Sequence, residues 1–145
     1  MAEELFKKRF TIYARNFDRA GENSTEIKEV LKGLNFDSDI IHRAVVVAFE
    51  AEMNVVMYAH EGTLTFVITD EDIQIDVRDV GPGIADIDQA MQEGFSTASD
   101  EMREMGFGFG MGLPNIKKNS DFLRIESEVG KGTTVSAKIR LNAHA

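Results

Sequence analysis

The chain contains no cysteine among its 145 residues, so neither a disulfide framework nor a thiolate zinc site can form. Long hydrophobic runs are also absent, because no window approaches the roughly 18 apolar residues that span a bilayer. The first residues lack the basic and then apolar layout of a secretory signal, so we expect a cytoplasmic protein. The three histidines (His42, His60 and His144) share no metal-ligand spacing, and we expect them to be structural.

Basic side chains are in the minority, with 16 lysines and arginines against 25 acids and a net charge of −9. This balance argues against nucleic acid or an anionic membrane as a partner, because neither supplies a positive counter-charge. The 43% hydrophobic and 28% charged fractions are typical of a globular domain. We therefore expect residues 1–145 to form a single domain.

The hydrophobic pattern alternates between strand and helix periods. Period-two alternation predicts strands over 9–17, 63–69, 73–79, 122–128 and 133–141. The second and third strands form one hairpin through an acidic turn, and the last two form another across residues 130–132.

End signals predict the helices. Residues 23–26 resemble a capping box and open a helix that stops near Gly33, and residues 37–39 start a long, largely apolar helix closed by Gly62. Short helices are expected within 84–92 and 114–119. The order predicts an α+β fold, a two-layer α/β sandwich with helices on one face of a single sheet.

Glu50 and Asn54 lie four residues apart, on one face of the long predicted helix. A glutamate can act as a general base and an asparagine carbonyl can ligate Mg²⁺. The alternative is a polar stripe at the edge of a core helix. Burying an unpaired acid and amide in an apolar stretch is costly, so this pair needs an explanation. Glu52 lies roughly 200° away around the helix and is expected to point elsewhere.

Asp79 ends a strand and leads into the turn Gly81-Pro82-Gly83-Ile84. A carboxylate there can accept the exocyclic amine of adenine, and the two glycines allow the backbone to approach a planar base. An ordinary Asp–Gly turn that ends a strand remains the alternative.

Four glycines alternate with apolar residues at positions 106, 108, 110 and 112, followed by Leu113. No Gly-Lys-Ser/Thr follows them, which excludes a phosphate loop, but their bare N–H groups precede a helix and could bind an anion. Arg103, just before them, could reach a terminal phosphate. A flexible loop without function, with Arg103 paired to neighbouring glutamates, remains open.

Together these motifs resemble the GHKL ATP-binding superfamily, which includes gyrase, the large heat-shock chaperone, histidine kinases and mismatch-repair ATPases. The resemblance rests on Glu50-x-x-x-Asn54, Asp79-x-Gly81-x-Gly83, the glycine-rich run and Gly132-Thr133, in that order. Within it, the chain is most similar to small anti-sigma factor and stressosome switch serine/threonine kinases, through residues 79–87, Glu93-Gly94-Phe95-Ser96-Thr97 and 110–114. It differs from the switch kinases by the extra polar segment 98–105.

The resemblance implies a Bergerat fold with a mixed, mostly antiparallel sheet and a lid over about 94–112. It implies ATP and Mg as cofactors, with Glu50 as the catalytic base and Asn54 as the Mg ligand. Asp79 would bind adenine through its amine and a bridging water, helped by Thr133. The residues expected to bind ATP are Asn54, Asp79, Gly81, Gly83, Ile84, Arg103, Gly106, Gly108, Gly110, Met111, Gly112, Leu113 and Thr133.

The function implied is a Mg-ATP-dependent serine/threonine protein kinase of a partner-switching system, acting on a STAS-domain antagonist protein. A sigma factor or another regulator would be a further partner, and a homodimer is compatible with the family. The alternative is a non-catalytic, ATP-gated protein-binding module, which apolar residues of the expected lid, such as Met102, Met105 and Phe107, would suit.

Overall fold

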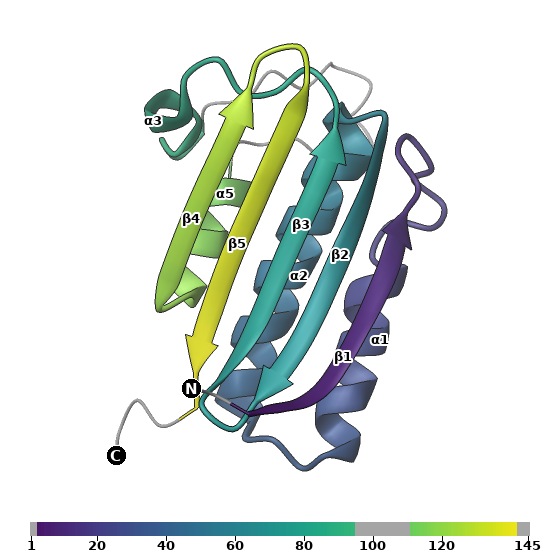
Figure 1. Ribbon diagram of the computed structural model, residues 1–145, viewed down its shortest axis with the longest axis vertical. Coiled ribbons are helices and arrows are strands. Elements are labelled where there is room, and N and C mark those ends of the chain that lie inside the picture. The colour runs from purple at the N-terminus through teal and green to yellow at the C-terminus, as the bar shows by residue number, and fades with distance from the viewer. Residues whose placement is uncertain (1–2, 95–110, 142–145) are drawn as a thin grey trace.

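The computed structural model describes residues 3–94 and 111–141, which form one sheet backed by helices (Figure 1). The order of the elements is the predicted one. They are β1 (Glu4–Ile12), α1 (Glu22–Gly33), α2 (Ser38–Tyr58), β2 (Glu61–Thr69), β3 (Asp72–Val80), α3 (Ile87–Ala90), α5 (Gly112–Asn119), β4 (Phe122–Glu128) and β5 (Gly132–Arg140).

The sheet has the strand order β1-β2-β3-β5-β4. All four pairings between these strands are antiparallel, so the parallel component of the expected mixed sheet is not found among the described residues. Helices α1, α2 and α5 cover one face of the sheet, as Figure 1 shows. The predicted two-layer α+β sandwich is confirmed.

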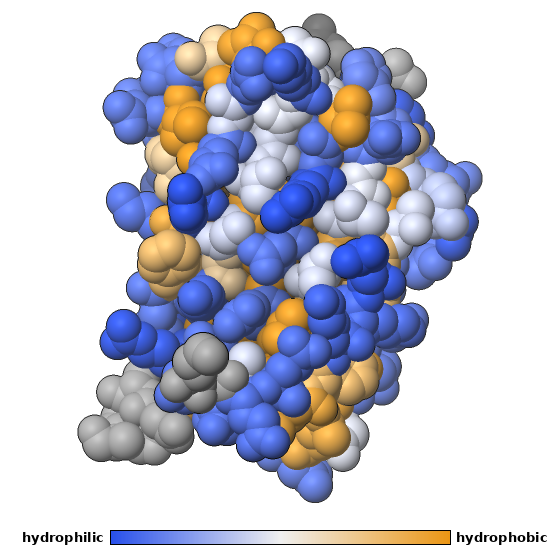
Figure 2. Space-filling view, viewed as in Figure 1, coloured by the Kyte–Doolittle hydropathy of each residue, from blue (hydrophilic) through white to orange (hydrophobic). Residues whose placement is uncertain are grey.

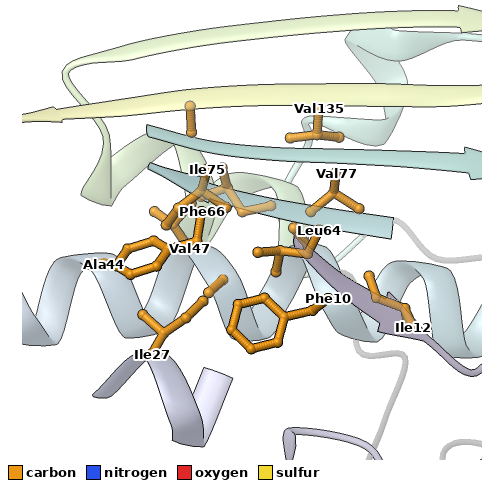
Figure 3. Close-up of a cluster of buried hydrophobic side chains, with 14 of the residues drawn as sticks. Phe10, Ile12, Ile27, Ala44, Val47, Leu64, Phe66, Ile75, Val77 and Val135 are labelled. Atoms are coloured by element: carbon orange, nitrogen blue, oxygen red, sulfur yellow. The ribbon is translucent and has the colours of Figure 1, made fainter. Parts of the chain in front are cut away.

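The core lies between α2 and the inner face of the sheet (Figure 3). Alternate residues of β3, Ile73, Ile75 and Val77, are at most 2% exposed and point toward the helices. Nine of the 21 residues of α2 are buried, including Val47 and Val55, and all nine lie between Ala44 and Met57. Burying one such side chain contributes about 1.5–3 kcal/mol, so the core holds the site-bearing ends of α2 and β3 together.

The uncovered face of the sheet is polar, as Figure 2 shows. Register places hydroxyl and charged residues side by side there, for example Thr65, Asp76 and Ser136 on neighbouring strands. Within residues 3–94 and 111–141, no helix combines the length and the apolar character needed to cross a bilayer.

Two predicted boundaries were wrong. The first strand spans Glu4–Ile12 rather than 9–17, because the chain turns away at Arg15, which has a φ of 63° and donates its N–H to the carbonyl of Val56. Gly62 does not end α2 but lies in β2, where a methyl group would come within 2.6 Å of the Val55 side chain. It is a close-packing glycine, not a helix stop.

The predicted capping box was also wrong. Helix α1 has Gly21 at its N-cap, and no side chain of its own caps its N–H groups. The carboxylate of Glu52, 2% exposed on α2, accepts the N–H of Ser24 at 3.2 Å and that of Asn23 at 3.4 Å. Glu52 therefore points away from Glu50, as predicted, and joins α1 to α2.

Candidate functional site

The second half of α2 carries Glu50 and Asn54, both half-buried, beneath the first turn of α5. A methyl group placed on Gly112 would lie 3.4 Å from Oδ1 of Asn54 and 3.8 Å from Oε1 of Glu50. Because Gly112 carries no side chain, the backbone at the start of α5 can lie close over the acid and the amide.

Glu50 has a partner that the sequence did not reveal. Asn115 on α5 donates its Nδ2–H to Oε2 of Glu50 over 2.7 Å. This bond connects the two helices that face each other at the site. A polar residue one turn into the helix after the glycine-rich run was the available signal, but its target on α2 could not be read from spacing.

The side chain of Asn54 has no hydrogen-bond partner in the part of the chain that the structure describes. Its amide oxygen is therefore free to ligate a hard cation, which fits Mg²⁺. The described residues contain no group of three His, Asp or Glu side chains that could hold a metal. A cation here would need water and substrate oxygens to complete its shell, which is usual for Mg²⁺.

Asp79 lies half-buried at the end of β3. The backbone N–H of Thr133, on the neighbouring strand β5, donates to its Oδ1 over 3.1 Å. Burial raises the pKa of Asp79, while this hydrogen bond and the charge of His60 act in the opposite direction. Among the described residues nothing bonds to Oδ2, so one oxygen of Asp79 is available as an acceptor.

Glycines pack closely around Asp79. Gly83 has a φ of 76°, and a methyl group on it would lie 2.5 Å from the carbonyl oxygen of Glu128. A methyl group on Gly132 would overlap the carbonyl of Asp79 itself, and one on Gly81 would lie 2.9 Å from Cα of Ala59. What these glycines approach is protein backbone, so the predicted approach to a planar base stays a prediction.

Ser127 is a second residue that sequence reasoning missed. Its Oγ accepts the N–H of Ile84 at 2.7 Å and lies 2.9 Å from Oγ1 of Thr133, which is 9% exposed. The one signal was a hydroxyl at an inward-facing position of β4, where Leu123 and Ile125 are apolar. Ser127 thus ties the turn after Asp79 to strand β5.

The predicted site residues form two clusters joined by α2. Glu50, Asn54 and Gly112 make one, and Asp79, its glycines, Ile84 and Thr133 make the other. Ala59, the residue that follows α2, packs under Gly81, and the helix from Asn54 to its end at Tyr58 spans about 6 Å. Met111 is the N-cap of α5 and Leu113 is buried beneath it. Arg103, Gly106, Gly108 and Gly110 lie outside the described residues.

Residues 39–143 match the family described as histidine kinase-, DNA gyrase B- and HSP90-like ATPase. The chain belongs to this family. The predicted superfamily is therefore confirmed. Both clusters of site residues lie within the matched residues 39–143.

Individual relatives point to one branch of the ATPase family. The chain is 32% identical over 126 residues to an anti-sigma F factor of Geobacillus thermodenitrificans, covering 87% of this chain and 75% of the relative. It is 32% identical over 114 residues to the serine/threonine-protein kinase RsbT of Bacillus subtilis, covering 76% and 80%. The predicted similarity to anti-sigma factors and switch-type kinases is confirmed.

A solved structure shares the fold. The structure of the RsbU and RsbW domains of Rv1364c from Mycobacterium tuberculosis matches with a TM-score of 0.63 and 15% identity. The match covers 94% of this chain but 33% of that longer one, so it bears on the fold alone.

Proposed function

We propose that this protein is a Mg-ATP-dependent serine/threonine protein kinase of a partner-switching system, and that its substrate is a STAS-type antagonist protein. The observation that carries the proposal is the juxtaposition of Glu50 and Asn54 under the bare backbone of Gly112. Similarity to a named serine/threonine-protein kinase supports the same reading.

Asp79 would read the adenine base. Its uncommitted oxygen would accept the exocyclic amine, which guanine lacks at that position, and the Thr133 hydroxyl would bind through a bridging water. The fixed hydrogen bond from the Thr133 N–H supports this role, because it orients the carboxylate before the nucleotide arrives.

Glu50 would then accept the proton of a partner serine or threonine hydroxyl. As that oxygen forms its bond to the γ-phosphorus, the bond to the β,γ-bridging oxygen breaks and ADP leaves. Mg²⁺ held by Asn54 would supply charge neutralisation on the phosphates. Met111, Gly112, Leu113 and the glycines before them would donate backbone N–H groups to phosphate oxygens, and Arg103 would contact the terminal phosphate.

The test is labelling with Mg²⁺ and γ-labelled ATP in an extract of the source cells. One small protein should gain label on serine or threonine. Glu50→Ala should bind ATP and transfer about 10²–10⁴-fold more slowly, as expected for loss of a general base. Asn54→Ala should lose ATP affinity and transfer together. Glu29→Ala, which removes an exposed acid of α1, is the matched control and should be unchanged. Normal labelling by Glu50→Ala would disprove the mechanism.

An ATP-gated binding module is the second candidate, and the name of the anti-sigma F factor relative favours it. Here ATP would switch the affinity for a sigma factor or another regulator without phosphoryl transfer. The two candidates separate on Glu50→Ala, which would leave complex formation and its nucleotide dependence intact. A complex that forms equally with ATP, with ADP and without nucleotide would exclude the binding module.

A further inference from the structure

We propose that Asn115 is a positioning residue for Glu50, holding the carboxylate so that one oxygen faces the backbone of Gly112. The inference rests on the proposed function, in which Glu50 is the base. It adds a residue from another helix, which neither the motifs nor the relatives assign.

The contact itself is short and one-sided. Nδ2 of Asn115 lies 2.7 Å from Oε2 of Glu50, within the range of a charge-assisted hydrogen bond. Oε1 of the same carboxylate faces Gly112, since a methyl group there would lie 3.8 Å from it. The hydrogen bond thus engages Oε2 and leaves Oε1 toward Gly112, the side on which the proposed function places the substrate hydroxyl.

The donor is held on a fixed helix. The N–H of Asn115 bonds to the carbonyl of Met111 at 2.9 Å, and its own carbonyl accepts from Nδ2 of Asn119 at 2.9 Å. One turn further, Nε of Arg43 on α2 donates to the carbonyl of Asn119 at 3.1 Å, and Arg43 pairs with Asp121. Because α5 is fastened to α2 at its far end independently of Asn115, this side chain has little to add as a helix clamp.

Asparagine at position 115 can orient the Glu50 carboxylate without forming an ion pair with it. A lysine or arginine in place of Asn115 would form an ion pair and stabilise the charged carboxylate, which would weaken it as a proton acceptor. An amide NH₂ group donates hydrogen bonds without carrying a charge. Preorganising a reacting group in this way reduces the ordering needed in the transition state.

The first test is kinetic. Asn115→Ala should lower kcat of phosphoryl transfer about 10- to 100-fold, the scale expected when a reacting group is misplaced by about 1 Å, with KM for ATP within about twofold. Lys117→Ala, an exposed position on the same helix, should change neither constant. A higher KM with unchanged kcat would assign Asn115 to nucleotide binding or packing and overturn the proposal.

A double-mutant cycle then asks whether Asn115 acts through Glu50. In the Glu50→Gln background, adding Asn115→Ala should change the residual rate by less than about twofold, because the group to be positioned is already gone. An equal fold-loss in both backgrounds would show that Asn115 acts independently of Glu50 and would overturn the proposal.

A spectroscopic measurement needs no kinase activity. In the ¹⁵N-labelled full chain without nucleotide, the Asn115 side-chain amide proton should move upfield when Glu50→Ala removes the acceptor, and it should not move in Glu29→Ala. Absence of that shift overturns the hydrogen bond and the proposal with it. If the shift is present but the wild-type chain transfers no phosphate to any protein, the proposed kinase function fails, and the base-positioning role fails for that separate reason.

Discussion

The backbone N–H of Thr133 donates to Oδ1 of Asp79 over 3.1 Å, across the pairing of β5 with β3. This bond stabilises the ionised carboxylate, but burial has the larger effect and raises the pKa of Asp79 above its ordinary value of 3.8. Asp79 is therefore a partly desolvated acceptor. The ionised form of such a group destabilises the fold, and carboxylates with pKa values shifted in this way are typical of functional sites.

Asp79→Asn should weaken ATP binding about tenfold or more, because an NH₂ group replaces an oxygen and cannot accept the adenine amine. Without nucleotide, the variant should be at least as stable as wild type at pH 7, since its Oδ1 can still accept the Thr133 N–H. The raised pKa means that ionised Asp79 destabilises the fold as pH rises from about 3.8 through the raised value. In urea unfolding across that interval, the stability of Asp79→Asn relative to wild type should increase with pH. An Asp79→Asn variant less stable than wild type at pH 7 would contradict this account.

Gly83 lies in the left-handed region of backbone conformation, and a Cβ atom added there would overlap the Glu128 carbonyl. Gly83→Ala should lower the free energy of unfolding by roughly 2–4 kcal/mol, from about 1–2 for the left-handed backbone and the rest from overlap with the Glu128 carbonyl. Gly130→Ala is the matched control, because Gly130 has a φ of 82° with nothing within 4 Å of the added methyl group. Gly130→Ala should lower the free energy of unfolding only by the roughly 1–2 kcal/mol assigned to the left-handed backbone. Equal losses in thermal or urea unfolding would show that the close contact at Gly83 is unimportant.

Glu52, on α2, caps the N-terminus of α1. Comparing Glu52→Ala with Glu52→Gln should show how much of its effect on stability comes from hydrogen bonding and how much from its charge. Glu52→Ala leaves the N–H groups of Asn23 and Ser24 unpaired and should cost about 2 kcal/mol or more of unfolding free energy. Glu52→Gln keeps an acceptor and should cost less. Glu29→Ala, on the exposed face of α1, is the control.

The pH dependence of Glu52 gives a second check. Burial raises the pKa of Glu52 above its ordinary 4.5, so its contribution is most favourable below that pH and is lost as pH rises through the raised value. Wild type should therefore lose stability relative to Glu52→Gln over that interval. A wild type that instead gains stability relative to Glu52→Gln as pH rises would mean that the ionised form is the one stabilised.

Local patterns predicted most of the fold because their signals lie within each element. The alternation at 63–69 and 73–79 and the acidic turn between them were enough to place one hairpin. The same reasoning failed at residues 9–17, where alternation continues past Ile12 but the backbone turns at Arg15. The capping box failed because the carboxylate of Glu52, 28 residues away from Ser24, satisfies the helix end instead.

For the candidate site, residue spacing predicted only relationships between residues of the same helix or strand. Glu50 and Asn54 share a helix face by periodicity, and Asp79 ends a strand. The donation from Asn115 to Glu50 and the network at Ser127 depend on how α5 packs on α2 and how β4 pairs with β5, which no single-segment pattern encodes.

Ser127 offers the last prediction, because it links the turn at Ile84 to Thr133. Ser127→Ala removes the acceptor of the Ile84 N–H and the partner of the Thr133 hydroxyl, so the free energy of unfolding should fall by about 1 kcal/mol. ATP affinity should fall several-fold as well, since the turn beside Asp79 and the Thr133 hydroxyl would lose their common anchor. Ser136→Ala is the matched control, because Ser136 lies on the outer face of the neighbouring strand β5. Calorimetric titration of both variants would decide the point: if Ser127→Ala binds ATP as tightly as Ser136→Ala, the hydroxyl network serves the fold and not the nucleotide.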